Sequence, residues 1–272
     1  MINAGRALML PALLLFLLCP ASQAALTFGV VPQQSAQKLA RNWGPICTYL
    51  SEKTGIDVRF ATAPAITEFE HRLAEGRYDF AYMNPYHYTV FSKTPGYLAI
   101  ARQKDKKITG IIVVNRDAPY NHLSDLNGKT LAFPSPAAFA ASILTRRHFQ
   151  AAGISITPKY VNSHDSVYHN VAQGFYEAGG GVERTFMNID PDVRKNLKIL
   201  WKTNSYTPHA IAAHPRVTKA IRHRLRNALI MMNDDSAARS LLKAINFNGF
   251  TAAADSDWND VRDLGIEMIN KD

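Results

Sequence analysis

Short apolar segments alternate with longer segments of helical periodicity along this chain of 272 residues, and this alternation constrains its fold more than any other feature. The apolar run 26–31 precedes a helical stripe that includes Leu39 and Trp43. The strand-like segment 58–61 precedes a second stripe, which begins at Ile66. Strands that alternate with helices usually form a parallel sheet with helices on both faces. We therefore predict an α/β fold built on mainly parallel sheets flanked by helices.

The middle of the chain repeats this pattern and predicts a second α/β unit. It opens with the strongly apolar segment 108–114. The tail is mostly helical, but the short apolar segment 210–213 has the composition of a strand that returns to the first unit. A unit inserted into another is joined to it by two crossings, and such a two-strand hinge can close over a ligand. We predict a discontinuous first lobe, residues 25–109 and 206–272, and an inserted second lobe, residues 110–205.

The N-terminus has the pattern of a secretory signal. Arg6 precedes the apolar run 7–18, which is too short for a comfortable membrane span, and small residues follow up to Ala24. We expect residues 1–24 to be a signal peptide that is cleaved after Ala24, which places the mature chain in the periplasm. Cys19 raises the alternative of a lipoprotein, although the leucine and proline that flank it suit lipidation poorly.

The charge, the cysteines and the histidines exclude several functions. The formal net charge is +9, which favours anionic ligands, but the basic residues are dispersed and form no arm for nucleic acid. Cys47 would be the only mature cysteine and could form no internal disulfide. His164 and His169 are five residues apart, as are His209 and His214, which does not place two metal ligands on one helical face. We expect no metal, no cofactor and no nucleic acid.

The sequence contains no recognisable catalytic motif. It has no Gly-x-Ser-x-Gly nucleophile elbow. The glycines 179–181 are not followed by the Lys-Ser/Thr ending of a phosphate-binding loop. They indicate instead a backbone brought close to another group, or a turn that needs positive φ.

Two predicted helix starts follow strands and would point their amide groups into a cleft. Ser135, followed by proline, suits an N-cap that leaves the N–H groups of residues 137–139 free to bind an anion. Ser163 begins a second such start. There, His164 is a candidate ligand contact, as a donor or a cation, and Asp165 is a candidate cap. Ligands of α/β sheets bind at the carboxyl ends of strands, where both starts are expected to lie.

Polar and aromatic side chains also gather after other predicted strands. An aromatic ring with a polar tip makes a good cleft wall, because its body is apolar and its end can form a hydrogen bond. Packing within the first lobe is the alternative role for these residues. The candidates are Tyr82, Met83, Asn84 and Tyr86 after one strand, and Gln34, beside Gln33, after the first strand.

Several stretches along nearly all of the mature chain carry a resemblance to a known family. They include Phe28-Gly29-Val30, Asn42-Trp43-Gly44-Pro45, Gly76-Arg77-Tyr78-Asp79-Phe80-Ala81-Tyr82, Asp117-Ala118-Pro119, Leu126-Asn127-Gly128-Lys129 and Ser163-His164-Asp165-Ser166. In their order and spacing they resemble the phosphate/phosphite/phosphonate-type periplasmic substrate-binding proteins of ABC transporters. The resemblance implies a two-lobed, type II-like periplasmic binding protein fold and a ligand handed to an inner-membrane permease.

The resemblance also marks where this chain departs from the family. In phosphonate binders a Ser-Thr-Ser-like run opens the helix that here follows Ser135, and its hydroxyls hold the oxyanion. This chain has Ala137, Ala138 and Phe139 there, which point to a ligand with an apolar part or to a tighter cleft. An acidic family residue follows a later strand, and Glu183 is the candidate that would substitute for it.

We therefore predict a periplasmic solute-binding component of an ABC importer, monomeric and without catalysis. Its ligand would be a small anion of the phosphonate, phosphite or phosphate kind, bound in the cleft between the lobes. Two alternatives stay open: a ligand-sensing partner of a membrane receptor kinase, and an enzyme on the same scaffold. The residues predicted to bind the ligand are Gln34, Tyr82, Met83, Asn84, Tyr86, Ser135, Ala137, Ala138, Phe139, His164, Asp165 and Glu183.

Overall fold

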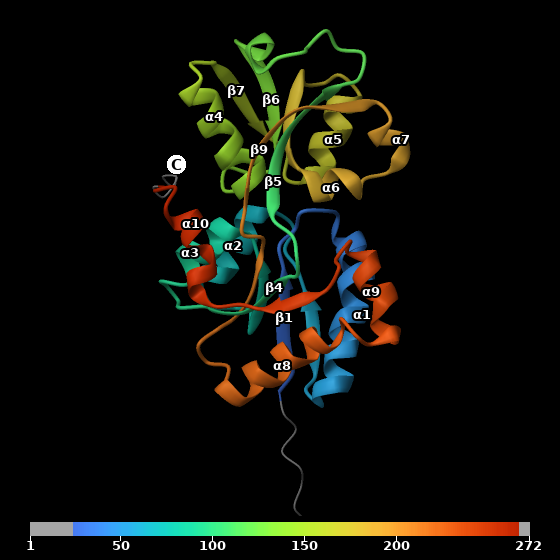
Figure 1. The fold of residues 1–272 in the computed structure, drawn as a ribbon, viewed down its shortest axis with the longest axis vertical. Coiled ribbons are helices and arrows are strands. Elements are labelled where there is room, and N and C mark those ends of the chain that lie inside the picture. Colours follow the sequence, from blue (N-terminus) through green and yellow to red (C-terminus); the bar gives the residue numbers. More distant parts are fainter. Residues whose placement is uncertain (1–23, 267–272) are drawn as a thin grey trace, which may run out of the picture.

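The structure, a computed structural model, describes residues 24–266 as two lobes stacked along the long axis of the molecule (Figure 1). The predicted signal peptide, together with Cys19, lies outside the described residues except for Ala24. Within residues 24–266, no helix is long and apolar enough to cross a membrane.

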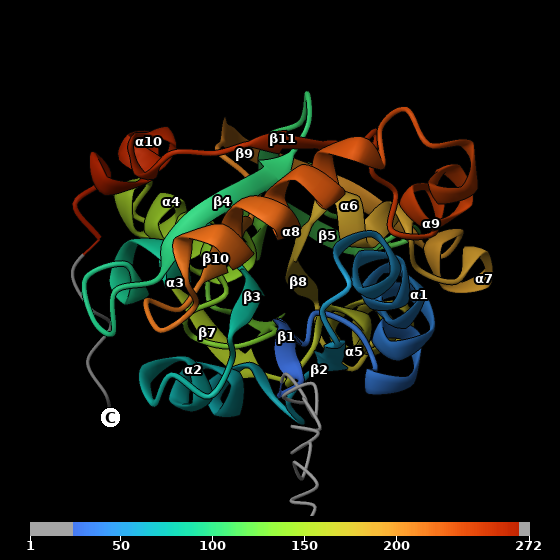
Figure 2. The ribbon, with the colours of Figure 1, turned by 90° about the horizontal axis from the view of Figure 1, so that it is seen from below.

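The first lobe is built from the two ends of the described chain. Its strands are β1 (Leu26–Val30), β2 (Val58–Ala61), β3 (Phe80–Met83), β4 (Leu98–Gln103), β10 (Ala210–Ala213) and β11 (Phe250–Ala252), in the sheet order β11-β4-β10-β3-β1-β2. Its helices are α1 (Ala36–Thr54), α2 (Ile66–Ala74), α3 (Pro85–Phe91), α8 (Lys219–Met231), α9 (Arg239–Ala244) and α10 (Asn259–Arg262), with short 3-10 turns at Ser236–Ala238 and Asp255–Trp258. Figure 2 shows α1 and α9 on one side of this sheet and α2 and α3 on the other.

The second lobe is built from the middle of the chain. Its strands are β5 (Ile108–Asn115), β6 (Lys129–Phe133), β7 (Ile156–Tyr160), β8 (Ala178–Val182) and β9 (Leu197–Tyr206), in the sheet order β7-β6-β8-β5-β9. Its helices are α4 (Thr145–Ala151), α5 (His164–Ala172), α6 (Glu183–Met187) and α7 (Pro191–Arg194), with a 3-10 turn at Leu123–Leu126 and a π-helix at Phe139–Leu144. The paired strands β5 and β9 reach from this lobe towards the first (Figure 1).

The apolar patterns of the sequence account for both cores. In α1 the predicted stripe is buried, and Trp43 packs between Phe28 of β1 and Tyr82 of β3, with ring centroids 5.9 and 4.6 Å apart. In β5 alternate residues serve opposite faces of the second sheet, so that Ile111 belongs to one apolar cluster and Ile112 to the other. A strand buried on both faces reads as a continuous apolar run, which is the pattern of segment 108–114.

The predicted α/β fold class, with two lobes flanked by helices, is confirmed, but the sheets are mixed rather than mainly parallel. In the first sheet β1 pairs in parallel with β2 and β3, whereas β10 is antiparallel to β3 and β4, and β11 is antiparallel to β4. In the second sheet β6 is parallel to β7 and β8, whereas β5 is antiparallel to β8 and β9. Three of the strands with antiparallel partners, β5, β9 and β10, adjoin the points where the chain passes between the lobes. A chain that returns from the other lobe enters the sheet from the opposite end, and this reverses its direction.

Candidate functional site at the junction of the lobes

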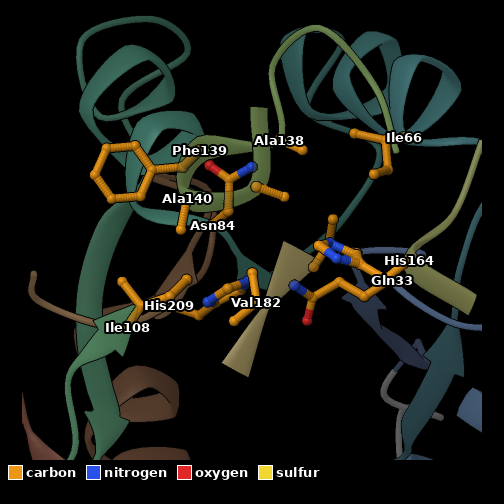
Figure 3. A pocket seen from close by; sticks show the side chains of 12 residues that line it. Gln33, Ile66, Asn84, Ile108, Ala138, Phe139, Ala140, His164, Val182 and His209 are labelled. Carbon is orange, nitrogen blue, oxygen red and sulfur yellow. The ribbon is translucent and has the colours of Figure 1, made fainter. Parts of the chain in front are cut away.

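A cavity lies where the two lobes meet, and both lobes contribute side chains to it (Figure 3). The first lobe supplies residues that follow β1 and β3 or precede β10, and the second supplies the π-helix and the start of α5. The free volume is about 10 Å³, room for about one water molecule, so the lobes are closed on each other. The lining residues are Val31, Gln33, Ile66, Asn84, Ile108, Ala138, Phe139, Ala140, Ala141, His164, Val182 and His209.

His164 lies at the first position of α5, where Ser163 caps the helix by accepting from the Ser166 N–H at 3.1 Å. Its backbone N–H crosses the junction and donates to the Gln33 carbonyl of the first lobe at 3.1 Å. The side chain is 2% exposed, and its Nδ1 has no hydrogen-bond partner. Burial, and then the positive charge of Arg184, lowers the pKa of His164 from 6.5 to about 3. The imidazole is therefore neutral and can offer one donor to a ligand.

His209 faces the same cavity from the first lobe. It lies between β9 and β10 and stacks on the ring of Tyr82, with centroids 4.8 Å apart and planes 19° from parallel. The side chain is 2% exposed, and its Nε2 has no hydrogen-bond partner. Burial, and then the charge of Arg184, lowers the pKa of His209 well below 6.5. The cavity thus holds a second neutral imidazole with an unsatisfied nitrogen.

Arg184 brings a positive charge to this region from the second lobe. It lies in α6 and lines a neighbouring hollow that shares Val31 and Gln33 with the cavity. Its Nη2 donates to the Gln33 Oε1 at 2.7 Å, and its guanidinium carbon lies 5.6 Å from the ring centroid of Phe247. Among residues 24–266, no carboxylate forms an ion pair with Arg184. A guanidinium whose contacts are a neutral amide and an aromatic ring keeps a charge that an anion can balance.

Asn84 joins the lobes directly. It is the N-cap of α3 and accepts from the His87 N–H at 2.8 Å. Its Nδ2 donates to the Ala137 carbonyl of the second lobe at 3.1 Å. The imidazole of His87 is itself held by the Glu70 carboxylate at 2.9 Å. Asn84 is therefore fixed in orientation by its own helix while it reaches across the junction.

The structure brings some of the predicted binding residues to this junction. Asn84, Ala138, Phe139 and His164 line the cavity, whereas Gln34 and Tyr82 line the neighbouring hollow with Arg184. Gln33, which the sequence offered beside Gln34, lines both.

Other predicted residues lie elsewhere. Met83 is fully buried in β3, and Tyr86 is 8% exposed in α3, and neither lines the cavity or the hollow. Asp165 lines neither, and burial raises the pKa of its carboxyl group, with Lys38 opposing the rise. Glu183, the first residue of α6, lines neither and is paired with Lys202 of β9.

The predicted helix start at Ser135 is wrong. Residues 135–138 form a turn in which the Ala138 N–H donates to the Ser135 carbonyl at 3.3 Å, and the helix that follows is a π-helix capped at Ala138, without a side-chain bond. The Ala137 carbonyl, which a helix capped at Ser135 would use as a helical acceptor, accepts instead from the Asn84 Nδ2 of the first lobe at 3.1 Å. The Ser135 hydroxyl is buried without a hydrogen-bond partner and does not line the cavity.

The glycines 179–181 lie inside β8, and the close approach that the sequence suggested is confirmed. A Cβ on Gly180 would lie 2.1 Å from the Ala141 carbonyl oxygen, and one on Gly181 would lie 2.3 Å from the Tyr168 hydroxyl. The positive-φ alternative does not apply, since these glycines are not in the left-handed region. Without side chains, β8 lets α5 and the π-helix approach the sheet closely.

Comparison with known proteins agrees with this architecture. A family model described as "ABC transporter, phosphonate, periplasmic substrate-binding protein" matches residues 28–258. The phosphonates-binding periplasmic protein of Escherichia coli K12 is 20% identical over 263 residues, covering 89% of this chain and 76% of its own. A probable ABC transporter phosphite-binding protein of Prochlorococcus marinus MIT 9301 is 20% identical over 268 residues, covering 89% of each chain. The structure of PhnD1 from that organism with methylphosphonate superposes with a TM-score of 0.81 at 17% identity, covering 89% of this chain and 97% of its own.

Proposed function

The chain belongs to the family of periplasmic phosphonate-type substrate-binding proteins of ABC transporters, and we propose that it captures a small oxyanion between its lobes and delivers it to a membrane permease. Members of this family bind and transport, so no catalysis is proposed. The ligand class comes from the chemistry of the junction, and it agrees with the phosphonate and phosphite named for the relatives.

The observation that carries the proposal is the pair of unpartnered imidazole nitrogens. His164 Nδ1 and His209 Nε2 are buried at one cavity, each from a different lobe, and neither has a hydrogen-bond partner. A buried polar atom without a partner costs about 1–3 kcal/mol. An oxyanion supplies several acceptor oxygens at once, so that a neutral imidazole from each lobe can donate to it. Arg184 adds the charge that a neutral pair lacks.

We propose that residues 25–109 and 206–266 of the described chain move as one lobe against residues 110–205, with β5 and β9 as the hinge. The Thr109 and Ser205 hydroxyls, 2.8 Å apart, join these strands where they leave the second lobe. A free volume of about 10 Å³ cannot admit a phosphonate, so the lobes must part before a ligand enters. Hydrogen bonds that would break on opening include Asn84 to Ala137, His164 to Gln33, Arg184 to Gln33, Lys38 Nζ to the Asn188 carbonyl and Arg147 to the Leu264 carbonyl.

The site of action follows from the family, which is periplasmic. We propose that residues 1–24 are removed on export, leaving a monomer that meets the permease by its closed lobes. Sequencing the N-terminus of the protein recovered from the periplasm checks this, with residue 25 expected as the first residue. Lipidated protein that begins at Cys19 would overturn it.

Calorimetric titration with methylphosphonate, phosphite and phosphate tests the ligand class, with sulfate as a further oxyanion. At least one of the phosphorus oxyanions is expected to bind, and a His164→Ala variant should bind it at least 10-fold more weakly, as expected for a lost donor to a charged group. Ser142→Ala is the control, because that hydroxyl is buried in the π-helix and does not line the cavity. If no oxyanion binds, or if the parent and both variants bind with equal affinity, the proposed oxyanion site is refuted.

Acidification is expected to destabilise the ligand-free protein through the cavity histidines. The unfolded chain binds protons at these imidazoles below about pH 6.5, whereas in the folded chain burial keeps the pKa of His164 at about 3 and that of His209 well below 6.5. The free energy of unfolding therefore falls as the pH drops from about 6.5 towards 3. At about pH 5 the loss from His164 amounts to about 2 kcal/mol, and His209 contributes a loss of the same sign.

Urea denaturation at about pH 7.5 and about pH 5 measures this effect. A His164→Gln variant removes one titrating group and should lose about 2 kcal/mol less than the parent over the same interval. An identical loss in the two proteins would mean that His164 is accessible to protons in the folded state.

A further inference from the structure

The lining of the junction carries one sign of charge. Arg184 is the only side chain with a full charge among the described residues that line the cavity and the neighbouring hollow, and no aspartate or glutamate lines either. The other polar groups are neutral, with His164 and His209 as imidazoles and Gln33 and Asn84 as amides.

Three acidic residues lie near this lining, and two of them, Glu70 and Glu183, have partners of their own. Glu70 binds the His87 imidazole at 2.9 Å, and Glu183 pairs with Lys202. Asp165 interacts with Lys38 and His169, outside the cavity lining. Glu70 and Glu183 are therefore unavailable to a group bound beside His164 unless these pairs break. The Asp165 Oδ1 is buried without a hydrogen-bond partner, but Asp165 lines neither the cavity nor the hollow, and burial raises the pKa of its carboxyl group, which favours the neutral form.

A cationic group would therefore be unfavourable in this cavity. An ammonium taken out of water needs a paired charge or several acceptors to offset its lost hydration. The lining offers no carboxylate, and Arg184 would repel a second positive charge at close range. The rest of the wall is apolar, with Ile66, Ile108, Phe139 and Val182 facing the cavity.

We infer that this site selects small oxyanions whose substituent is absent or apolar, and that it rejects zwitterions such as aminoalkylphosphonates. This inference rests on the proposed oxyanion site and specifies its ligand class. Arg184 with the two imidazoles would hold the anionic end. The apolar wall would contact the substituent, and the lack of a carboxylate would exclude an amine.

Calorimetric titration with a matched pair of ligands tests this inference. Ethylphosphonate and 2-aminoethylphosphonate share the anionic group and differ by one amine. Ethylphosphonate is expected to bind at least 30-fold more tightly. Equal affinities, or tighter binding of the amine, would overturn the inference while leaving the oxyanion site intact. If neither these two ligands nor phosphite binds, the proposed function fails and the inference fails with it.

A Gln33→Glu variant separates charge from size. Glutamate has nearly the same shape, and the Gln33 Oε1 already accepts from Arg184, so the change places a carboxylate in the lining. The preference for ethylphosphonate should fall to less than about 5-fold, because the carboxylate neutralises Arg184 and can pair with an amine. A preference as large as that of the parent would show that the cavity rejects the amine by its size, which contradicts the inference.

Discussion

An Arg184→Met variant is expected to lose at least about 100-fold in affinity for methylphosphonate while its free energy of unfolding stays within about 1 kcal/mol of the parent. A hydrogen bond to a charged group is worth about 1.5–3 kcal/mol, and the guanidinium can form two to a phosphonate. In the free protein Arg184 donates to a neutral amide and lies over the Phe247 ring. Methionine keeps much of that apolar contact, so the fold should lose little.

Two further variants make the Arg184 result decisive. Arg184→Lys keeps the charge but loses the planar fork, and we expect an intermediate loss of about 10-fold. Arg41→Met is the matched control, since Arg41 is exposed on α1 and lines neither the cavity nor the hollow. It should bind within about 2-fold of the parent. Parent-like binding by Arg184→Met would show that the anion does not meet this guanidinium.

A Gly180→Ala variant is expected to lower the free energy of unfolding by about 3 kcal/mol, the upper part of the range for overpacked cores. The added Cβ would lie 2.1 Å from the Ala141 carbonyl oxygen, which is backbone and cannot rotate away. The π-helix lies equally close to β5, where a Cβ on Gly110 would lie 2.1 Å from the Ala140 carbonyl oxygen, so it packs tightly along both strands. The π-helix lines the cavity, so ligand affinity should fall as well.

Gly44→Ala is the control for this prediction, because it adds the same methyl group in open space. Gly44 lies inside α1, and apart from its chain neighbours and the adjacent helix backbone no heavy atom lies within 4 Å of the Cβ that alanine would add. Alanine is favoured over glycine inside a helix by about 0.5–1 kcal/mol, whereas Pro45 disfavours a Cβ on the helical residue before it. The two effects oppose each other, so this variant should stay within about 1 kcal/mol of the parent. Urea denaturation of both variants gives the comparison. Equal stability of Gly180→Ala and the parent would contradict the tight packing of β8 against the π-helix.

The fold could be predicted from the sequence because its strongest signals are local. The spacing of apolar residues predicts the alternation of strands and helices, and the continuous apolar run 108–114 indicates a strand buried on both faces. No comparable local pattern of residues predicts the direction of a strand in its sheet. The antiparallel course of β10 depends on where the chain re-enters the first sheet, which is a property of the whole fold.

The unpredicted antiparallel direction of β10 also explains why His209 was not predicted as a site residue. In a parallel sheet, site residues are expected after the strands, since the carboxyl ends of the strands share one edge. β10 is antiparallel, and its first residue, Ala210, pairs with Met83 at the end of β3. The residue before β10 therefore lies at the edge where Asn84 follows β3. If β10 had been predicted to be antiparallel, the residue before it, His209, would have been expected at this edge of the sheet.

Arg184 was missed because the resemblance directed attention to an acid. Glu183 and Arg184 are consecutive, and consecutive residues of a helix face different directions. Glu183 is directed to Lys202, and Arg184 to Gln33 of the other lobe. A signal was present: an arginine three residues after the β8 glycines, just past the carboxyl end of a strand, in a chain with a predicted preference for anions.

A crystal structure of the mature chain with methylphosphonate tests the central claim most directly. The account predicts phosphonate oxygens within hydrogen-bond distance of His164 Nδ1, His209 Nε2 and the Arg184 guanidinium. The methyl group is expected against the apolar wall near Ile66 and Phe139. A phosphonate bound between the lobes without contact to either imidazole, or one bound outside the junction, would contradict it.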